Sequence, residues 1–206
     1  MSSSTRWSRA DAAPPAGSLL RRSAALLVVP LLAAIGCALS NFAHAAIVEA
    51  PEHVRRYIDN PRPSGTGRLT WFGLHVYDAR MFVPREFDPS KPEARPFALE
   101  ITYARSLAGR AIAERSRDEI AQLGFGSTAQ RDRWLVEMSG LFPDVKPGQR
   151  LVGIYRPGGP TRFYVDGRFL GEVVDPEFGR AFFAIWLDPR TSVPQLRASL
   201  LSEAHR

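Results

Sequence analysis

Alternating apolar and polar positions predict the strands of this chain. The clearest case is residues 97–103, where every second side chain is apolar, so that one face of a strand would be buried. Residues 68–83 are rich in Trp, Phe, Val and Tyr, and they predict either two strands or one long strand bent near Gly73. Three more strands are predicted at 150–155, 161–165 and 169–174, the last two joined by the tight-turn pair Asp166-Gly167.

Apolar residues at helical spacing predict helices after these strands. Ser106 is a suitable N-cap for a helix that runs up to Gly124. A second helix is predicted over residues 128–141. Asp175 and the proline after it open a third helix, and a last short helix covers residues 194–201. Three tryptophans are predicted to lie in the core or to line a cavity there: Trp71, Trp134 and Trp186.

The order of these elements predicts an α+β fold. Strands come first, followed by a pair of helices, three strands and another helix. This order is typical of an antiparallel sheet with a layer of helices on one face. Residues 46–64 contain three prolines and are predicted to be an irregular lead-in, so the folded domain would comprise residues 65–206. Such a fold leaves space for an apolar ligand between the sheet and the helices.

Residues 1–45 have the composition of a secretory signal peptide. Four arginines precede an apolar run from Ala24 to Leu39, and Ala43-His44-Ala45 offers a cleavage site flanked by small residues. The mature protein would then begin at Ala46, and we expect it in the periplasm.

Two alternatives would attach the chain to a membrane. The leader could stay uncleaved as an anchor, although its apolar run is shorter than the ~20 residues of a membrane-spanning helix. Cys37 could instead carry a lipid, as in lipoproteins. The sequence predicts no particular oligomeric state.

Composition and charge exclude several kinds of partner. Apolar residues make up 45% of the chain and charged residues 23%, as in soluble globular proteins. The net charge of +6 is dispersed, with no basic run interleaved with aromatic residues, so we expect no nucleic-acid partner. Cys37 is the only cysteine and the four histidines are scattered, so we expect no disulfide, metal site or cofactor.

Residues 109–119 combine a glycine with Ile112, Arg115 and Glu119 at helical spacing, so these three side chains would share one face of a helix. This spacing resembles the active-site helix of chalcone isomerases, whose pattern is Gly-(Lys/Gln)-Gln-Tyr-x-x-Lys-x-x-x-Asn. Residues 97–103 look like the strand that precedes this helix in that family.

Two further segments extend the resemblance to most of residues 66–187. Residues 67–83 look like the family's early strand pair, and a match on Val76 and the tyrosine after it puts Phe72 at the position of the catalytic threonine. Residues 147–187 look like the family's three strands and following helix. The likeness is strongest to exported bacterial chalcone isomerase-like proteins. It implies an open-faced sandwich of one large sheet and a helical layer.

The residues at the family's catalytic positions argue against the family's own reaction. Arg115 could supply the cation that the lysine provides, but Phe72 and Ile112 cannot donate the hydrogen bonds that stabilise an enolate. Glu119 adds a negative charge that opposes one. We therefore expect a non-catalytic protein. If it is an enzyme, we expect an isomerase or intramolecular lyase that acts on a substrate other than a chalcone.

These replacements favour a site for an apolar acid such as a fatty acid. Phe72 and Ile112 would line the cleft, and Arg115 could hold a carboxylate, as in the fatty-acid-binding members of the wider family. Further candidates for the head-group site are Tyr103, Tyr77, Arg68 and Glu119. The remaining hypothesis is a structural envelope protein without a small ligand, in which Arg115 only forms an exposed ion pair along its helix, worth about 0.3–0.5 kcal/mol.

Overall fold

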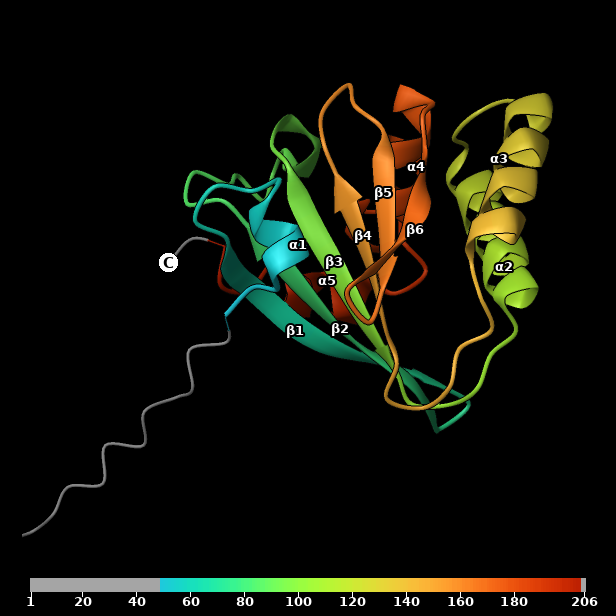
Figure 1. Cartoon of the computed structure of the whole chain (residues 1–206), viewed down its shortest axis with the longest axis horizontal. Helices are drawn as coiled ribbons and strands as arrows, with labels where there is room; N and C mark the ends of the chain where they lie inside the picture. Colours follow the sequence, from blue (N-terminus) through green and yellow to red (C-terminus); the bar gives the residue numbers. More distant parts are fainter. Residues whose placement is uncertain (1–48, 205–206) are drawn as a thin grey trace, which may run out of the picture. The chain divides into compact units, whose positions relative to one another are not determined.

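A six-stranded antiparallel sheet forms the centre of the structure, and each strand pairs with its neighbours in sequence (Figure 1). The computed structural model describes residues 49–204 of the chain. The strands are β1 Arg62–Trp71, β2 Leu74–Val83, β3 Phe97–Tyr103, β4 Arg150–Tyr155, β5 Thr161–Val165 and β6 Arg168–Val173. The predicted division near Gly73 therefore produces two strands. The longest connection, between β3 and β4, contains two helices.

The helices lie mostly on one side of this sheet, which confirms the predicted α+β architecture. They are α1 Glu52–Arg55, α2 Gly109–Leu123, α3 Thr128–Leu141, α4 Pro176–Leu187 and α5 Pro194–Leu200, with a short 3-10 turn at Pro92–Ala94. In Figure 1, α4 and α5 lie behind the sheet, α2 and α3 stand beside β6, and α1 lies in front.

The main hydrophobic core lies between the sheet and helices α2 to α5, and aromatic side chains dominate it. Phe97 of β3 packs edge-to-face on Phe183 of α4, with ring centroids 4.9 Å apart. Phe163 of β5 packs in the same way on Phe182, at 5.3 Å. Such edge-to-face pairs contribute about 0.5–1.5 kcal/mol beyond the burial of apolar area. Helix α4 is therefore the central element of the helical layer.

A second, smaller core lies on the opposite face of the sheet, beneath α1. Val54 and Ile58 pack there with Phe82, Ala98 and neighbouring residues of β4 and β5. The prediction that residues 97–103 form a half-buried strand is therefore wrong, because six of the seven residues of β3 are buried. The sequence pattern showed only the face toward the main core.

Strand β1 begins at Arg62, so the last residues of the predicted lead-in and the glycines after them belong to the sheet. Gly65 explains this, because a Cβ atom at this position would lie 2.0 Å from the backbone oxygen of Ser199 in α5. The missing side chain allows α5 to pack directly on the strand. The pairing of β1 with β2 shifts register twice, between Pro63 and Gly65 and again near Thr70.

Helix α2 begins at Gly109, and Ser106 is not its N-cap as predicted. The backbone N–H of Gly109 donates instead to the Asp144 carboxylate, at 2.9 Å, from the loop before β4. Leu107 pairs with Val145 in an isolated bridge, which brings this loop to the start of the helix. A distant residue therefore caps the helix and leaves the local serine unused.

Three other predicted features at element ends are confirmed. Gly124 ends α2 with a φ of 82°, and Asp175 caps α4 by accepting a bond from the Glu177 N–H at 2.9 Å. The turn at Asp166 and Gly167 has φ angles of 47° and 82°, as the tight hairpin requires.

The predicted leader, with its cleavage site and Cys37, lies outside the described residues. Within residues 49–204, no helix has the length and apolar composition needed to cross a membrane. The described residues, 49–204, form a compact unit, and both hydrophobic cores lie within it. This unit therefore contains the core that it needs to fold on its own.

Candidate functional site

Helix α2 places the three residues of the predicted site on one face, at different depths. Ile112 is half-buried and packs against the main core. Glu119 lies one turn after Arg115, and its side chain is only 6% exposed, whereas that of Arg115 is 60% exposed. The face therefore extends from a buried carboxylate to a guanidinium at the surface.

Both oxygens of the buried Glu119 carboxylate accept hydrogen bonds. Arg115 donates from Nη2 to Oε1, and Ser192, in the loop between α4 and α5, donates from Oγ to Oε2 at 2.9 Å. These bonds compensate for the burial of a charged group, which would otherwise be strongly unfavourable. They also connect α2 to the loop before α5.

The Arg115 guanidinium also contacts an aromatic ring. Its Cζ atom lies 5.6 Å from the centroid of Trp71, the last residue of β1, in a cation–π arrangement. Trp71 is 55% exposed, so the prediction that it lies in the core is wrong, whereas Trp134 and Trp186 are buried as predicted. The difference arises because Trp71 lies at the end of the β1–β2 hairpin.

The half-buried Tyr77 and the buried Tyr103 lie near this surface contact. Tyr77 of β2 accepts a hydrogen bond from the indole N–H of Trp186 at 2.9 Å, and its ring packs edge-to-face on Tyr103 at 6.3 Å. Burial raises the pKa of Tyr77 to about 12, and the nearby charge of Glu119 adds to this shift while that of Arg115 opposes it. Burial raises the pKa of Tyr103 as well. Both hydroxyls therefore stay protonated at neutral pH.

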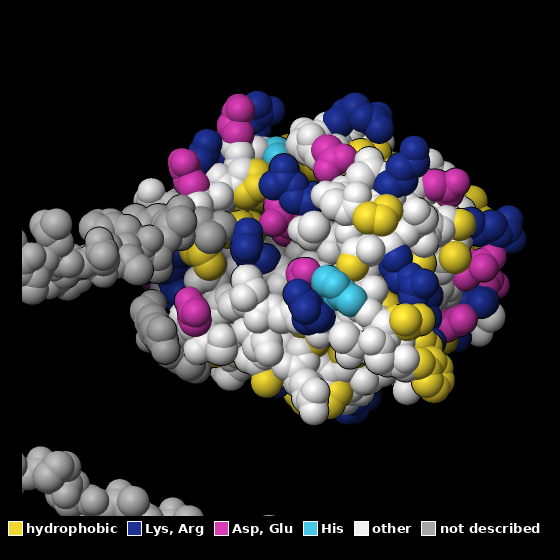
Figure 2. All heavy atoms as spheres, turned by 90° about the horizontal axis from the view of Figure 1, so that it is seen from below, with side chains coloured by type: hydrophobic (Ala, Val, Ile, Leu, Met, Phe, Trp, Pro, Cys, Tyr) yellow, Lys and Arg dark blue, Asp and Glu magenta, His cyan; other side chains and the backbone are white. Residues whose placement is uncertain are grey.

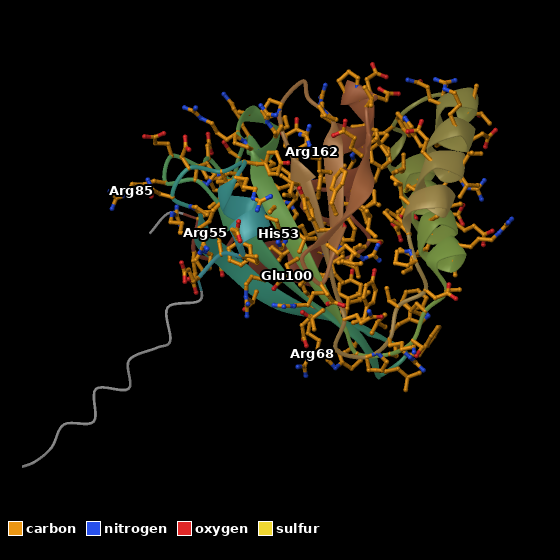
Figure 3. All side chains as sticks on the ribbon, in the orientation of Figure 1. His53, Arg55, Arg68, Arg85, Glu100 and Arg162 are labelled. Atoms are coloured by element: carbon orange, nitrogen blue, oxygen red, sulfur yellow. The ribbon has the colours of Figure 1, made fainter. Side chains whose placement is uncertain are left out.

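Two of the predicted site residues lie apart from this cluster. Phe72 occupies the turn between β1 and β2, and its side chain is 89% exposed. Arg68 lies on β1 and donates from Nε to Asp78 at 2.8 Å, and Figure 3 shows it at the lower edge of the sheet. This bond holds the pKa of Asp78 below its usual value.

The structure thus replaces the predicted site by a different set of residues, which we call the Arg115 cluster. Sequence analysis missed Trp186 and Ser192 as members of it, because the tryptophan fits a core position and a loop serine carries no periodic signal. The members of the Arg115 cluster are Ile112, Arg115, Glu119, Tyr77, Tyr103, Trp71, Trp186 and Ser192.

A cavity of about 240 Å³ with a mixed apolar and charged lining, which includes Glu93 and Asp188, lies elsewhere between the sheet and the helical layer. Phe97, Phe183 and Leu187 line it together with Arg180 and Arg197. Arg197 donates from Nε to the backbone oxygen of Leu187 at 2.7 Å. Arg180 is exposed and forms no ion pair with a carboxylate among residues 49–204. Arg115 does not line this cavity. An acidic head group could therefore bind at either of two exposed arginines, Arg115 or Arg180.

A wider hollow of about 580 Å³ lies on the opposite face, between α1 and the β5–β6 turn. His53 stacks on Tyr164 there, with ring centroids 4.6 Å apart, and the Tyr164 hydroxyl lies 3.2 Å from that of Tyr57. Burial, followed by the charges of Arg150 and Arg56, lowers the pKa of His53. This imidazole is therefore neutral at neutral pH (Figure 3 labels His53).

The Arg115 cluster combines groups that can bind a polar head group. Within the described part of the chain, no three His, Cys, Asp or Glu side chains are grouped so that they could hold a metal ion. The cluster contains one guanidinium, one carboxylate and three hydroxyls. These groups can hold an anionic or hydrogen-bonding ligand without any cofactor.

A solved structure with the same fold supports the architecture. The crystal structure of an Arabidopsis thaliana fatty-acid binding protein superposes with a TM-score of 0.56 and covers 71% of this chain and 89% of that protein. Sequence identity is 14%, so this likeness concerns the fold.

Sequence comparison identifies the family. A Haemophilus influenzae protein described as uncharacterized is 31% identical over 144 residues, which are 69% of this chain and 68% of that protein. The sequence profile of the chalcone isomerase-like family matches residues 64–202, which include the whole sheet except the start of β1. The chain therefore belongs to the chalcone isomerase-like family.

Proposed function

We propose that this protein binds a small apolar acid of the fatty-acid class and does not catalyse a reaction on it. The acid's head group binds at the Arg115 cluster. One observation carries the proposal: an accessible guanidinium lies near the half-buried Tyr77, whose ring packs on the buried Tyr103, and both hydroxyls retain a hydrogen to donate.

The number of hydrogen-bond donors without a partner supports this head-group site. A guanidinium carries five N–H donors, and Arg115 uses one of them on Glu119. The Tyr77 hydroxyl accepts from Trp186, so its own hydrogen is free to donate. The Tyr103 hydroxyl makes no hydrogen bond to any residue between 49 and 204. A ligand carboxylate could therefore accept bonds from Arg115 and from a tyrosine at the same time.

The apolar part of such a ligand has compatible surroundings. Ile112, Trp71 and Trp186 belong to the same cluster, and they offer apolar and aromatic surface beside the charged groups. The Arabidopsis protein with this fold is a fatty-acid binding protein, so the architecture is compatible with an apolar acid. Ile112, which aligns with a catalytic hydroxyl of the family, cannot donate a hydrogen bond, and this supports a binding role.

The experiment is a titration of the protein comprising residues 46–206 with dodecanoate, followed by native mass spectrometry and calorimetry. We expect one molecule to bind. Arg115→Gln should weaken binding by about tenfold or more, because a charge-assisted hydrogen bond is lost. Arg180→Gln is the matched control, since it removes an exposed arginine beside the 240 Å³ cavity instead.

Three outcomes are informative. Loss of affinity in Arg115→Gln alone supports the proposal. Loss of affinity in Arg180→Gln alone would indicate that the head group binds in the cavity beside α4, and it would contradict the Arg115 site. No binding of dodecanoate to the wild-type protein would overturn the function itself.

We further propose that the protein acts in the periplasm. The arginine-rich start, the apolar run and the small residues up to Ala45 support this location. Mass measurement of the protein from a periplasmic extract should give a chain that begins at Ala46. A full-length chain in the cytoplasmic fraction, or a lipid on Cys37, would contradict this form of export.

A further inference from the structure

The turn between β1 and β2 exposes a group of large apolar side chains, which we call the hairpin patch. It consists of Trp71, Phe72 and Leu74, which are 55%, 89% and 55% exposed. The turn lies at the lower edge of the molecule in Figure 1. Figure 2 views the molecule from this side and shows hydrophobic side chains exposed toward its right-hand end, among charged ones. Exposed apolar side chains that are grouped in this way indicate an interaction site.

The backbone of the turn is unfavourable for the residue that it carries. Phe72 and Gly73 have φ angles of 47° and 76°, so this two-residue turn places both residues in the left-handed region. Asn-Gly is the favoured pair in such turns, and a bulky residue is uncommon there. The ring of Phe72 contacts that of Trp71 at 5.1 Å but is otherwise in solvent. Packing within the protein therefore does not explain the choice of phenylalanine.

Unpaired charge beside the hairpin patch is positive. The Ala104 N–H donates to the Val76 oxygen at 2.9 Å, which places Arg105 next to the start of β2. The bridge between Leu107 and Val145 places Lys146 in the adjoining loop. Neither Arg105 nor Lys146 forms an ion pair with a residue of the described chain.

The acidic groups at this end are already engaged. Asp78 binds Arg68, and the buried Glu119 binds Arg115. Asp144 accepts a hydrogen bond from the start of α2. The basic side chains are thus free to meet an anionic surface.

We propose that the hairpin patch docks this protein on the surface of a lipid bilayer that contains anionic lipids. Trp71 and Phe72 enter the headgroup region, where aromatic side chains are enriched, and Arg105 and Lys146 contact lipid phosphates. A second copy of the chain fits less well. Three side chains bury on the order of 400 Å², whereas a stable protein interface needs about 800 Å² on each partner.

The test uses the protein comprising residues 46–206, so that the leader cannot contribute to binding. Vesicles of phosphatidylcholine, with and without phosphatidylglycerol, are titrated in a sedimentation assay and by tryptophan fluorescence. Trp134 and Trp186 are 1% and 6% exposed, so a blue shift of the emission reports Trp71. We expect sedimentation and a blue shift with the anionic vesicles, both weakened by salt.

Two pairs of variants separate the apolar and electrostatic parts. Phe72→Asn should weaken binding to vesicles by about tenfold, since the variant lacks the aromatic side chain that would be buried in the bilayer. Val136→Asn on α3 is the matched control, because Val136 is 72% exposed and lies outside the hairpin patch. Lys146→Gln should weaken binding to anionic vesicles by about fivefold and leave binding to neutral vesicles unchanged. Lys91→Gln, in the loop before β3, should have no effect.

The proposal is overturned if the protein binds neither kind of vesicle, or if Phe72→Asn binds as tightly as Val136→Asn. It is also overturned if sedimentation velocity shows a dimer that Phe72→Asn dissolves, because a second copy then covers the hairpin patch. A protein that binds vesicles but fails to bind dodecanoate would contradict the proposed ligand alone. The two proposals can therefore fail separately.

Discussion

Removing the charge of Glu119 tests how the Arg115 cluster discriminates between ligands. Arg115 is shared between Glu119 and the proposed ligand, and the buried carboxylate repels any acid that approaches the same guanidinium. Glu119→Gln keeps the size of the side chain and an oxygen that can accept from Ser192. We therefore expect this variant to bind dodecanoate more tightly than the wild-type protein.

The size of the gain follows from Coulomb's law. A carboxylate on the free edge of the guanidinium would lie roughly 6 Å from that of Glu119. At an effective dielectric constant of ~20, two negative charges at this distance repel each other by about 3 kcal/mol. The Arg115 side chain is 60% exposed, so solvent and salt reduce this repulsion. We take about 1.4 kcal/mol for the repulsion that remains. Removing this repulsion in Glu119→Gln corresponds to about tenfold tighter binding.

The assay is calorimetry with dodecanoate at low and at physiological salt. Glu114→Gln is the matched control, because it removes the same charge from the same helix but faces Arg110. A fatty alcohol of equal chain length should bind wild type and Glu119→Gln alike. If Glu119→Gln gains no more than Glu114→Gln, the acid's head group does not lie beside Glu119 and the site is wrong.

Three further predictions concern stability, each measured by urea unfolding. Phe72→Asn should raise the free energy of unfolding by about 0.5–1 kcal/mol, because asparagine tolerates the positive φ. A lower free energy of unfolding in this variant would show that the Phe72 ring stabilises the turn. Asp175→Ala should lower it by about 3 kcal/mol, since α4 loses its cap and the buried Trp134 indole loses its acceptor at 2.9 Å, whereas Asp175→Asn should lose less than half of this. The pKa of His53 lies below its usual 6.5, so the unfolded chain binds the proton first and stability should decline as the pH falls through about 6.5. His53→Phe should flatten that decline, and equal slopes in both proteins would contradict the assignment.

The sequence predicts the elements well where the signal is local. Helix α3 and strands β3 to β5 have their predicted bounds, and a tight-turn pair or a helix cap marks several of the other boundaries. The lead-in and β1 were predicted less well, since Gly65 and Pro63 are locally typical of a loop. Only the packing of α5 against the strand shows why a glycine is needed there.

The candidate site was predictable in part. The helical spacing correctly placed Ile112, Arg115 and Glu119 on one face, because that spacing depends only on the geometry of α2. A break near Gly73 was predicted, but the sequence pattern did not decide between a bend within one strand and a hairpin turn, and only the turn exposes Phe72. Ser192 reaches Glu119 from 73 positions further along the chain, and no local pattern encodes such a contact.

The irregular pairing of β1 has a consequence for how this protein behaves at high concentration. An edge strand exposes unpaired N–H and C=O groups, and another chain can extend the sheet there and start a fibril. In β1, Pro63 cannot donate a hydrogen bond, and the two register shifts bend the strand away from a straight template. The first strand of the sheet thus carries its own protection against edge-to-edge aggregation.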